Sequence, residues 1–442
     1  MKKRLRGIVL LSLTVLALNA QAQRHEFTAA DAVEYARKNN TQVKNALLDV
    51  KIQEQTNREI TGSAYPQING SLNATDYLSI PTNLLPGELA GQPAGTYIPV
   101  KFGTKFIQSG GVSLQQILFD GQVFVGLQAR KTAIAFSQKN VEVTEENIKT
   151  NIYKIYYQLA ASDNQLRILD ANIERVQKLS NDTKKMFENG FAEKLDISRI
   201  DVQLANLRTE RQRAQNTINN GYLGLKVLMG MPVNDTLILT EKINEDNIRS
   251  GVLDAAAFNY QDRKDYQYAE LGKRLNEYNV RRYRLTKIPT VSLNSTFNVT
   301  RQSNKFGFGG PWYRTALIGL NVNVPIFDGF ARRARIQKAQ LQLEQSLNNI
   351  EGLKQNIDRE VHEAINNYSN ALATLNNQKR NMELAEQVYE QTRLKFQNGI
   401  GSNTEITSAQ SDLQVAQSNY ILAIYDAITA KIDFLKATGK LP

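Results

Sequence analysis

Side chains that could perform catalysis or hold a metal ion are scarce in this sequence. It contains no cysteine, which excludes a disulfide scaffold, a cysteine-ligated metal site and a cysteine nucleophile. Its two histidines, His25 and His362, lie far apart and have no metal-ligand or catalytic spacing. Residues Gly307 to Gly310 are glycine-rich, but they lie between two expected strands, whereas a phosphate-binding loop precedes a helix. We therefore expect no enzyme, cofactor site or metal site.

The charge of the chain is positive but widely distributed. There are 54 Lys and Arg against 43 Asp and Glu, which gives a formal net charge of +11. The Lys and Arg are scattered among acidic residues along expected helices, and no aromatic-rich basic motif is present. This pattern favours the solvated exterior of a helical protein and argues against a nucleic-acid partner.

The N-terminus has the pattern of a secretory signal peptide, which we expect at residues 1–22. Four basic residues precede an apolar run from Ile8 to Leu18, and Ala20-Gln21-Ala22 provides a cleavage site. The run is too short to span a membrane as a helix, and no later stretch is long enough. Since there is no cysteine, the mature protein is not expected to be lipidated there. A membrane role must therefore use β-strands or a surface contact.

A very long helix is the clearest element that the sequence predicts. Alternate steps of four and three residues from Leu343 to Phe396 reach sixteen positions, of which thirteen are apolar. A period of 3.5 residues without proline predicts a coiled-coil helix over residues 330–398, ~100 Å long at 1.5 Å per residue. The apolar positions are Leu343, Leu347, Ile350, Ile357, Val361, Ala364, Tyr368, Ala371, Leu375, Met382, Ala385, Tyr389 and Phe396.

The pattern of this long helix occurs a second time in the sequence, which predicts a duplicated architecture. Phe119-Asp120-Gly121 opens the first copy and Phe327-Asp328-Gly329 opens the second, 208 residues later. Phe187-Glu188-Asn189-Gly190 closes the first and Phe396-Gln397-Asn398-Gly399 closes the second, 209 residues later. Such constant spacing indicates an internal repeat. The aspartate at each strand-to-helix junction is expected to cap the helix that follows it.

The first repeat is expected at residues 23–230. It begins with a helix from Phe27 to Ala64, followed by a β-hairpin at 66–119. The hairpin contains an irregular loop from Pro81 to Pro99, because this segment holds four of the ten prolines. A helical hairpin at 121–230 completes the repeat.

The second repeat is expected at residues 254–442, after a connector at 231–253 with short elements outside the main body. A helix from about Leu253 to Lys287 precedes a β-hairpin at 290–326 and a helical hairpin at 329–438. Each repeat therefore follows the order helix, β-hairpin, long helix, tight turn and return helix.

The four expected strands each have one apolar face. In the first, Ile68 and Leu72 alternate with Asn69 and Ser71, and the other strands repeat this period of two. Strands of ~10–12 residues suit a membrane β-barrel, but four strands cannot close one, and open edges are not tolerated in lipid. The expected fold class is α+β, mostly α. It consists of a long coiled-coil helical barrel and a four-strand contribution per chain to a trimeric twelve-stranded barrel.

In this order and spacing the elements resemble the TolC family of outer-membrane efflux proteins. The resemblance covers the mature chain, with matching motifs at both Phe-Asp-Gly junctions and in the turn-and-return segments 185–196 and 395–410. It implies a homotrimeric channel-tunnel whose barrel lies in outer-membrane lipid and whose helices extend into the periplasm. It also implies a periplasmic adaptor (membrane fusion) protein and an inner-membrane RND or ABC transporter as partners. The exported substrates would be small molecules, such as drugs and toxic compounds, or proteins.

The resemblance also implies functional residues at the periplasmic end. Family tunnels narrow at acidic side chains after the turn glycine, which correspond here to Asp196 and Glu405. Three copies would form a ring of up to six carboxylates that selects cations. The alternative is that each is a solvated acid at a helix start. Residues expected at the tip turns and in adaptor docking are Gly190, Gly399, Gly401 and Ser402, and those at the strand-to-helix junctions are Asp120, Gly121, Asp328 and Gly329.

The competing functional class is a periplasmic coiled-coil structural protein without a pore. It would account for the heptads and the signal peptide. It leaves unexplained the four strands with an apolar face, which are placed in duplicate between the helices.

Overall fold

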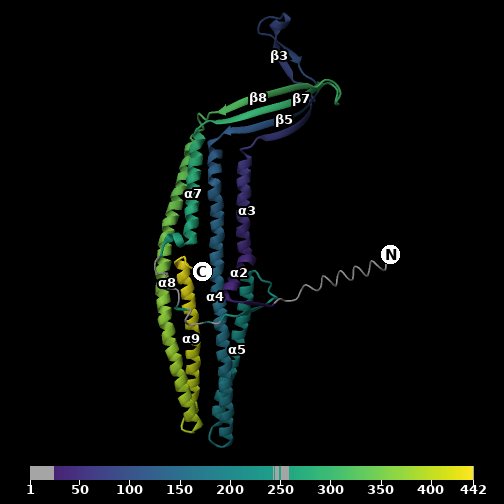
Figure 1. The fold of residues 1–442 in the computed structure, drawn as a ribbon. Helices are drawn as coiled ribbons and strands as arrows, with labels where there is room; N and C mark the ends of the chain where they lie inside the picture. Colours follow the sequence, from purple (N-terminus) through teal and green to yellow (C-terminus); the bar gives the residue numbers. More distant parts are fainter. Residues whose placement is uncertain (1–23, 242, 244–247, 250–257, 442) are drawn as a thin grey trace, which may run out of the picture. The chain divides into compact units, whose positions relative to one another are not determined.

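The computed structural model describes residues 24–241, 243, 248–249 and 258–441 (Figure 1). The expected signal peptide, part of the connector and the start of the helix expected from Leu253 lie outside these residues. The chain divides into two compact units. The first comprises residues up to Val50, Phe136–Glu270 and residues from Asn348, and the second comprises Lys51–Ala135 and Leu271–Leu347. The division into two sequence repeats stays a prediction.

The two predicted helical hairpins are confirmed as elements. Helices α4 (Gly121–Glu188) and α5 (Lys194–Met229) form the first, and α8 (Ala331–Gln397) and α9 (Asn403–Ala437) form the second. Within the first unit the heptad positions form the core, because this stripe of each helix faces its neighbours. Fully buried examples are Ile152, Leu169, Ile200, Leu225, Ile357, Leu375, Ile406 and Leu413.

The N-terminal segment differs from the single helix predicted from Phe27 to Ala64. Strand β1 (Arg24–Phe27) pairs in parallel with β6 (Thr236–Leu239), and two helices follow, α2 (Ala29–Asn39) and α3 (Thr41–Gly62). The break lies at Asn40, whose Oδ1 accepts from the backbone N–H of Gln42 at 2.7 Å. Its Nδ2 donates to the carbonyl of Leu228 on α5 at 2.6 Å. Asn40 therefore starts α3 as an N-cap while it anchors the break to α5.

Helix α7 (Lys264–Arg284) begins later than the predicted start at Leu253. A 3₁₀ turn, η4 (Tyr260–Asp262), precedes it, and Asn259 caps this turn by accepting from the Gln261 N–H. Arg263 then has an extended backbone, so the helix cannot start before Lys264. At its far end the helix tightens into η5 (Leu285–Lys287), which separates it from the sheet.

The second unit contains a four-stranded antiparallel sheet in the order β2-β5-β7-β8. The strands are β2 (Gln67–Asp76), β5 (Phe106–Phe119), β7 (Thr290–Ser303) and β8 (Tyr313–Asn323). Both expected hairpins form, and β5 and β7 join them into one sheet (Figure 1).

The register of the sheet places the apolar positions of all four strands on one face. Ile68 pairs with Leu114, Leu293 pairs with Leu320, and Phe297 lies between Val112 and Ala316. Because side chains alternate along each strand, these residues share a face and their polar neighbours share the other. The apolar face is open, since Leu72 is 90% exposed and Ile318 74% exposed.

The proline-rich segment from Pro81 to Pro99 is more ordered than predicted. It contains strand β3 (Thr82–Pro86) and a 3₁₀ turn, η2 (Gly87–Ala90), and strand β4 (Tyr97–Lys101) follows. Among the described strands these two pair only with each other, so each has one unpaired edge. A proline on such an edge removes no ladder hydrogen bond, which is why prolines are compatible with this ribbon.

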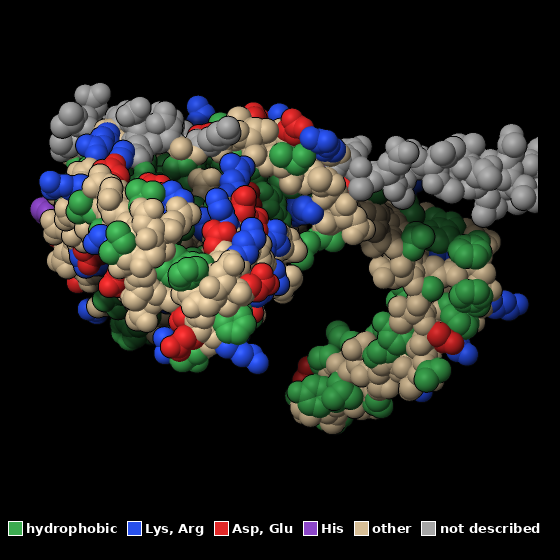
Figure 2. Space-filling view, turned by 90° about the horizontal axis from the view of Figure 1, so that it is seen from below, with side chains coloured by type: hydrophobic (Ala, Val, Ile, Leu, Met, Phe, Trp, Pro, Cys, Tyr) green, Lys and Arg blue, Asp and Glu red, His purple; other side chains and the backbone are tan. Residues whose placement is uncertain are grey.

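Lys and Arg side chains are interspersed with Asp and Glu on the face shown in Figure 2. This mixture agrees with the solvated helical exterior expected from the sequence. Within the described ranges, no helix has an apolar stretch long enough for a membrane span.

Candidate functional site at the hairpin tips

The two helical hairpins turn with the same backbone geometry. After α4, the N–H of Phe191 donates to the carbonyl of Met186 and that of Gly190 to the carbonyl of Phe187. After α8, Ile400 and Gly399 repeat these bonds to Lys395 and Phe396. This is the Schellman motif, which needs a left-handed residue. Gly190 at φ 81° and Gly399 at φ 74° supply it.

The second tip continues directly into α9. The N–H of Gly401 donates to the carbonyl of Lys395 at 3.1 Å, which folds the turn back on α8. Ser402 is the N-cap of α9, and its Oγ accepts from the backbone N–H of Glu405 at 3.2 Å. The docking role of Gly401 and Ser402 stays a prediction, and their observed role is to form the tip.

Asp196 lies in the first turn of α5. Its Oδ2 accepts from the backbone N–H of Glu193 at 3.1 Å, as part of a capping box. Its Oδ1 accepts from Nδ2 of Asn403, at the start of α9, at 2.9 Å. Asp196 therefore links the tip of one helical hairpin to the tip of the other.

Glu405 lies in the first turn of α9, two residues after Asn403. It is exposed, and in the described part of the chain its carboxylate has no hydrogen bond or ion pair. The structure thus brings Asp196 close to the start of α9 while leaving the Glu405 carboxylate open to solvent. Both acids favourably face the positive end of a helix dipole.

Asn403 is the tip residue that sequence reasoning missed. It is 9% exposed, and its Oδ1 has no hydrogen-bond partner. The pattern Ser402-Asn403-Thr404-Glu405 signals a helix start, which identifies Ser402 as a cap. It gives no sign that Asn403 reaches Asp196, because the two residues are 207 positions apart.

The helices behind the tips share one core. Leu179 of α4, Leu204 of α5, Phe396 of α8 and Ile406 of α9 belong to the same buried cluster. A hydrogen bond also joins α9 to α4, in which Nε2 of Gln410 donates to Oδ1 of Asn172 at 2.8 Å. The two carboxylates are therefore held on packed helices, which fixes their positions better than a free loop would.

The first strand-to-helix junction forms as predicted. Oδ1 of Asp120 accepts from the N–H of Gln122 at 2.7 Å, which caps α4. Gly121 is buried against η5, and a Cβ added there would lie 2.7 Å from the Cβ of Leu285. A glycine is therefore needed for the close approach of α4 to this segment.

The second junction differs from the first. Helix α8 begins only at Ala331, because Gly329 at φ 63° and Phe330 at φ 64° insert a left-handed turn after Asp328. Asp328 therefore lies outside the N-cap position. Its Oδ2 still accepts from the N–H of Arg332 at 2.9 Å, so it caps the helix from outside.

Comparison with known proteins gives a family model that matches part of the chain, and several relatives. Residues 260–440 match the family model described as outer membrane efflux protein. The outer membrane efflux protein BepC of Brucella suis is 22% identical over 451 residues, which cover 100% of this chain and 91% of the relative. The outer membrane protein TolC of Vibrio cholerae is 20% identical over 336 residues, 75% of this chain and 77% of the relative. The chain is therefore similar to outer membrane efflux proteins, and its residues 260–440 match their family model.

Solved structures confirm the fold of this chain. A crystal structure of CusC matches with a TM-score of 0.78 at 18% identity, covering 95% of both chains. The outer membrane protein VceC of Vibrio cholerae matches with a TM-score of 0.73 at 15% identity, covering 93% of this chain and 96% of that one. The fold class predicted from the sequence is thus confirmed.

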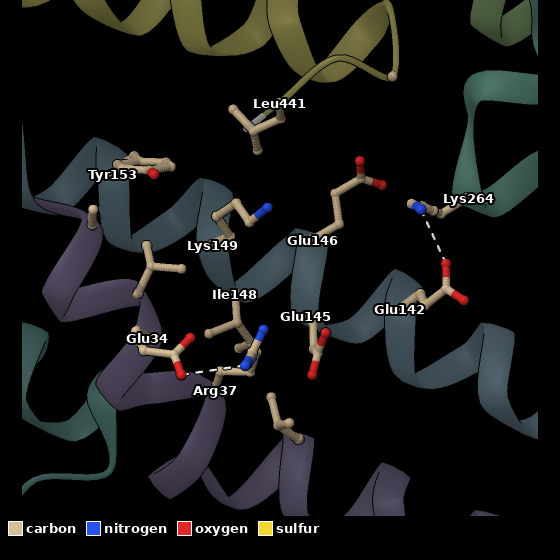
Figure 3. A pocket seen from close by; sticks show the side chains of 14 residues that line it. Glu34, Arg37, Glu142, Glu145, Glu146, Ile148, Lys149, Tyr153, Lys264 and Leu441 are labelled. Atoms are coloured by element: carbon tan, nitrogen blue, oxygen red, sulfur yellow. Dashed lines mark hydrogen bonds and ion pairs between the residues drawn. The ribbon is translucent and has the colours of Figure 1, made fainter.

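A pocket of about 490 Å³ lies between α2 and α4, beside Lys264 and the C-terminal segment (Figure 3). Glu142 forms an ion pair with Lys264 at 3.0 Å. Glu145 and Glu146 point into the pocket, and among the described residues neither carboxylate has a hydrogen bond or ion pair. Burial raises the pKa of both carboxyl groups, although nearby cations oppose this.

Neutralising Glu145 and Glu146 should stabilise the folded protein at neutral pH. A carboxyl group whose folded-state pKa is raised favours folding at low pH, and this contribution is lost as pH rises through the folded pKa. We expect Glu145→Gln with Glu146→Gln to raise the free energy of unfolding by about 1 kcal/mol at pH 7.5, discounted for partial exposure, and by little at pH 4. Thermal unfolding at both pH values measures this.

The matched control is Glu174→Gln, which changes an exposed glutamate on the same helix. This substitution should not alter the difference between the free energies of unfolding at pH 7.5 and pH 4. Equal free energies of unfolding for the double variant and the wild type at pH 7.5 would show that the pocket carboxylates do not destabilise the folded protein.

Proposed function

We propose that this protein is a homotrimeric outer-membrane channel-tunnel that exports small molecules or proteins. It works with a periplasmic adaptor and an inner-membrane RND or ABC transporter. The observation that carries the proposal is the sheet register, which gathers the apolar residues of four strands on one open face. An apolar face of this kind suits contact with lipid, and the opposite polar face suits a water-filled lumen.

The edges of the sheet support a trimer. Within the part of the chain that the structure describes, strands β2 and β8 each pair on one side only, so each leaves a row of backbone N–H and C=O groups unpaired. In lipid such groups must find partners, and the β8 edge of one copy can pair with the β2 edge of the next. Three copies give twelve strands, and the helical hairpins of three copies would enclose the tunnel.

The proposed narrow end of the tunnel is formed by the hairpin tips. Asp196 and Glu405 lie on the first turns of the two return helices, and a trimer would bring three copies of each acid together. We assign these six carboxylates to cation selection at the periplasmic opening. The tip turns are assigned to adaptor contact. The proposal assigns transport, and no catalytic step, to the molecule.

The trimer is tested first by mass. Protein purified in detergent should have three times the mass of one chain by native mass spectrometry, and it should conduct ions in a planar bilayer. A coiled-coil structural protein without a pore would give neither channel current nor a requirement for detergent. Stable monomers with no current would therefore favour that second function.

A further inference from the structure

Six exposed cations gather in the second unit, where α7 and α8 approach the sheet. They come from the last turn of α7 with η5 and from the first turns of α8. Within the described residues, none of their side chains has a hydrogen bond or ion pair. The six residues are Arg281, Arg284, Lys287, Arg333, Arg335 and Lys338.

The strand register places these two groups at the same end of the sheet. Thr290, the first residue of β7, pairs with Asn323, the last residue of β8. Residues 281–287 lead into β7 and residues 331–338 follow β8, so both groups lie near this end of the sheet, where Figure 1 shows α7 and α8. The cations therefore follow one boundary, between the sheet and the helices of the second unit.

Helix electrostatics account for only one of the two groups. Cations in the last turn of α7 complement the negative end of its dipole. The first turn of α8 has no acidic residue but contains Arg332 and Arg333, with Arg335 close behind, where positive charge opposes the dipole. Only Arg332 is compensated, by Asp328 at 3.6 Å. The two uncompensated cations at this helix start, Arg333 and Arg335, thus lower its stability and point to an external anion.

The segment that joins β8 to α8 presents apolar side chains beside these cations. Ile326 is 91% exposed, Phe327 74% and Phe330 69%. Phe330 has φ 64°, a left-handed conformation that is unfavourable for a bulky side chain. A strained, exposed phenylalanine next to arginines is typical of a chain that lies at a lipid surface, with its apolar groups inserted and its cations near phosphates.

We propose that this boundary, residues 281–287 and 324–338, binds the anionic headgroups of phospholipids in the leaflet that meets the helical side of the sheet. The inference rests on the proposed function, since it needs the apolar sheet face to lie in the membrane. That face ends at the same boundary, so the headgroups would meet the cations directly. Arg and Lys side chains here bind phosphodiester groups and fix how deeply the sheet is immersed.

Lipid binding by the purified trimer tests the inference. Native mass spectrometry would compare phosphatidylglycerol with phosphatidylcholine for the wild type and for Arg333→Gln, Arg335→Gln, Lys338→Gln. Each cation near an anionic surface contributes roughly fivefold to the affinity for that surface. The triple variant should therefore lose about tenfold or more of the preference for phosphatidylglycerol. The matched control is Lys185→Gln, Lys194→Gln, Lys395→Gln, which removes three exposed cations near the hairpin tips and should keep the preference.

Phe330→Gly provides a second variant that does not depend on charge. Glycine relieves the left-handed backbone, so the variant should unfold no more easily than the wild type while its spontaneous insertion into phosphatidylglycerol vesicles falls. Unchanged lipid preference in the triple variant and unchanged insertion of Phe330→Gly would overturn the inference, yet leave the trimer and its conductance intact. Loss of trimer in the triple variant would also overturn it, by assigning the cations to contacts between copies. A wild-type chain without trimer or current would instead overturn the proposed function.

Discussion

Replacing Arg263 by methionine should lower the free energy of unfolding by about 3 kcal/mol, because it breaks a buried ion-pair network. The guanidinium side chain is 5% exposed and lies between Asp265, at 2.6 Å, and Glu360 of α8, at 3.0 Å. Its Nη1 also donates to the carbonyl of Ala437, the last residue of α9, at 3.1 Å. Arg263 thus ties the start of α7 to α8 and to the end of α9.

The expected loss arises from the groups that Arg263 leaves behind. Although burial opposes the charged form, the hydrogen bonds that Arg263 donates to Asp265 and Glu360 raise the pKa of its guanidinium, so it is a cation throughout the usable pH range. Methionine fills much of the volume but leaves two carboxylates without their partner and one buried carbonyl unpaired. Thermal or denaturant unfolding in detergent measures the difference.

Arg211→Met is the matched control for this prediction. Arg211 also forms a short ion pair, to Asp170 at 2.6 Å, but both side chains are substantially exposed. Exposed pairs contribute little, so this variant should unfold almost like the wild type. If Arg263→Met and Arg211→Met lowered the free energy of unfolding by the same amount, the network around Arg263 would have no special role in stability.

Replacing Asp196 by Asn and Glu405 by Gln should remove most of the cation preference of the channel. If three copies of each acid surround a narrow opening, their charge governs which ions enter, even though the chain as a whole is basic. We expect block by multivalent cations from the periplasmic side to weaken by about tenfold or more. Reversal potentials and current block in a planar bilayer measure both effects.

The amide substitutions are chosen for their shape. Asp196 accepts hydrogen bonds from Glu193 and Asn403, so alanine there would disturb the tip as well as remove the charge. The control is Glu174→Gln with Glu386→Gln, which neutralises two exposed acids away from the tips. Unchanged selectivity in Asp196→Asn, Glu405→Gln, with the trimer intact, would contradict the assignment of these acids to the pore.

The sequence by itself determined the elements that depend on neighbouring residues. A heptad period without proline predicts α8 because every turn repeats the same apolar stripe, and the observed helix, Ala331–Gln397, agrees with the range 330–398. Alternating residues predict the four strands for the same local reason. The tip turns were also predictable, since Gly190 and Gly399 occupy positions where only a left-handed residue closes the motif.

The tertiary structure decided the features that join distant parts of the chain. Asn40 ends α2 because it reaches the carbonyl of Leu228, and the late start of α7 places Arg263 among groups on α8 and α9. The contact between Asp196 and Asn403 likewise depends on how two hairpins pack. Each of these contacts depends on packing register, which is set by the fit of whole apolar faces. No local pattern encodes that fit, so the sequence placed the acids at helix starts but could not show which side chains they meet.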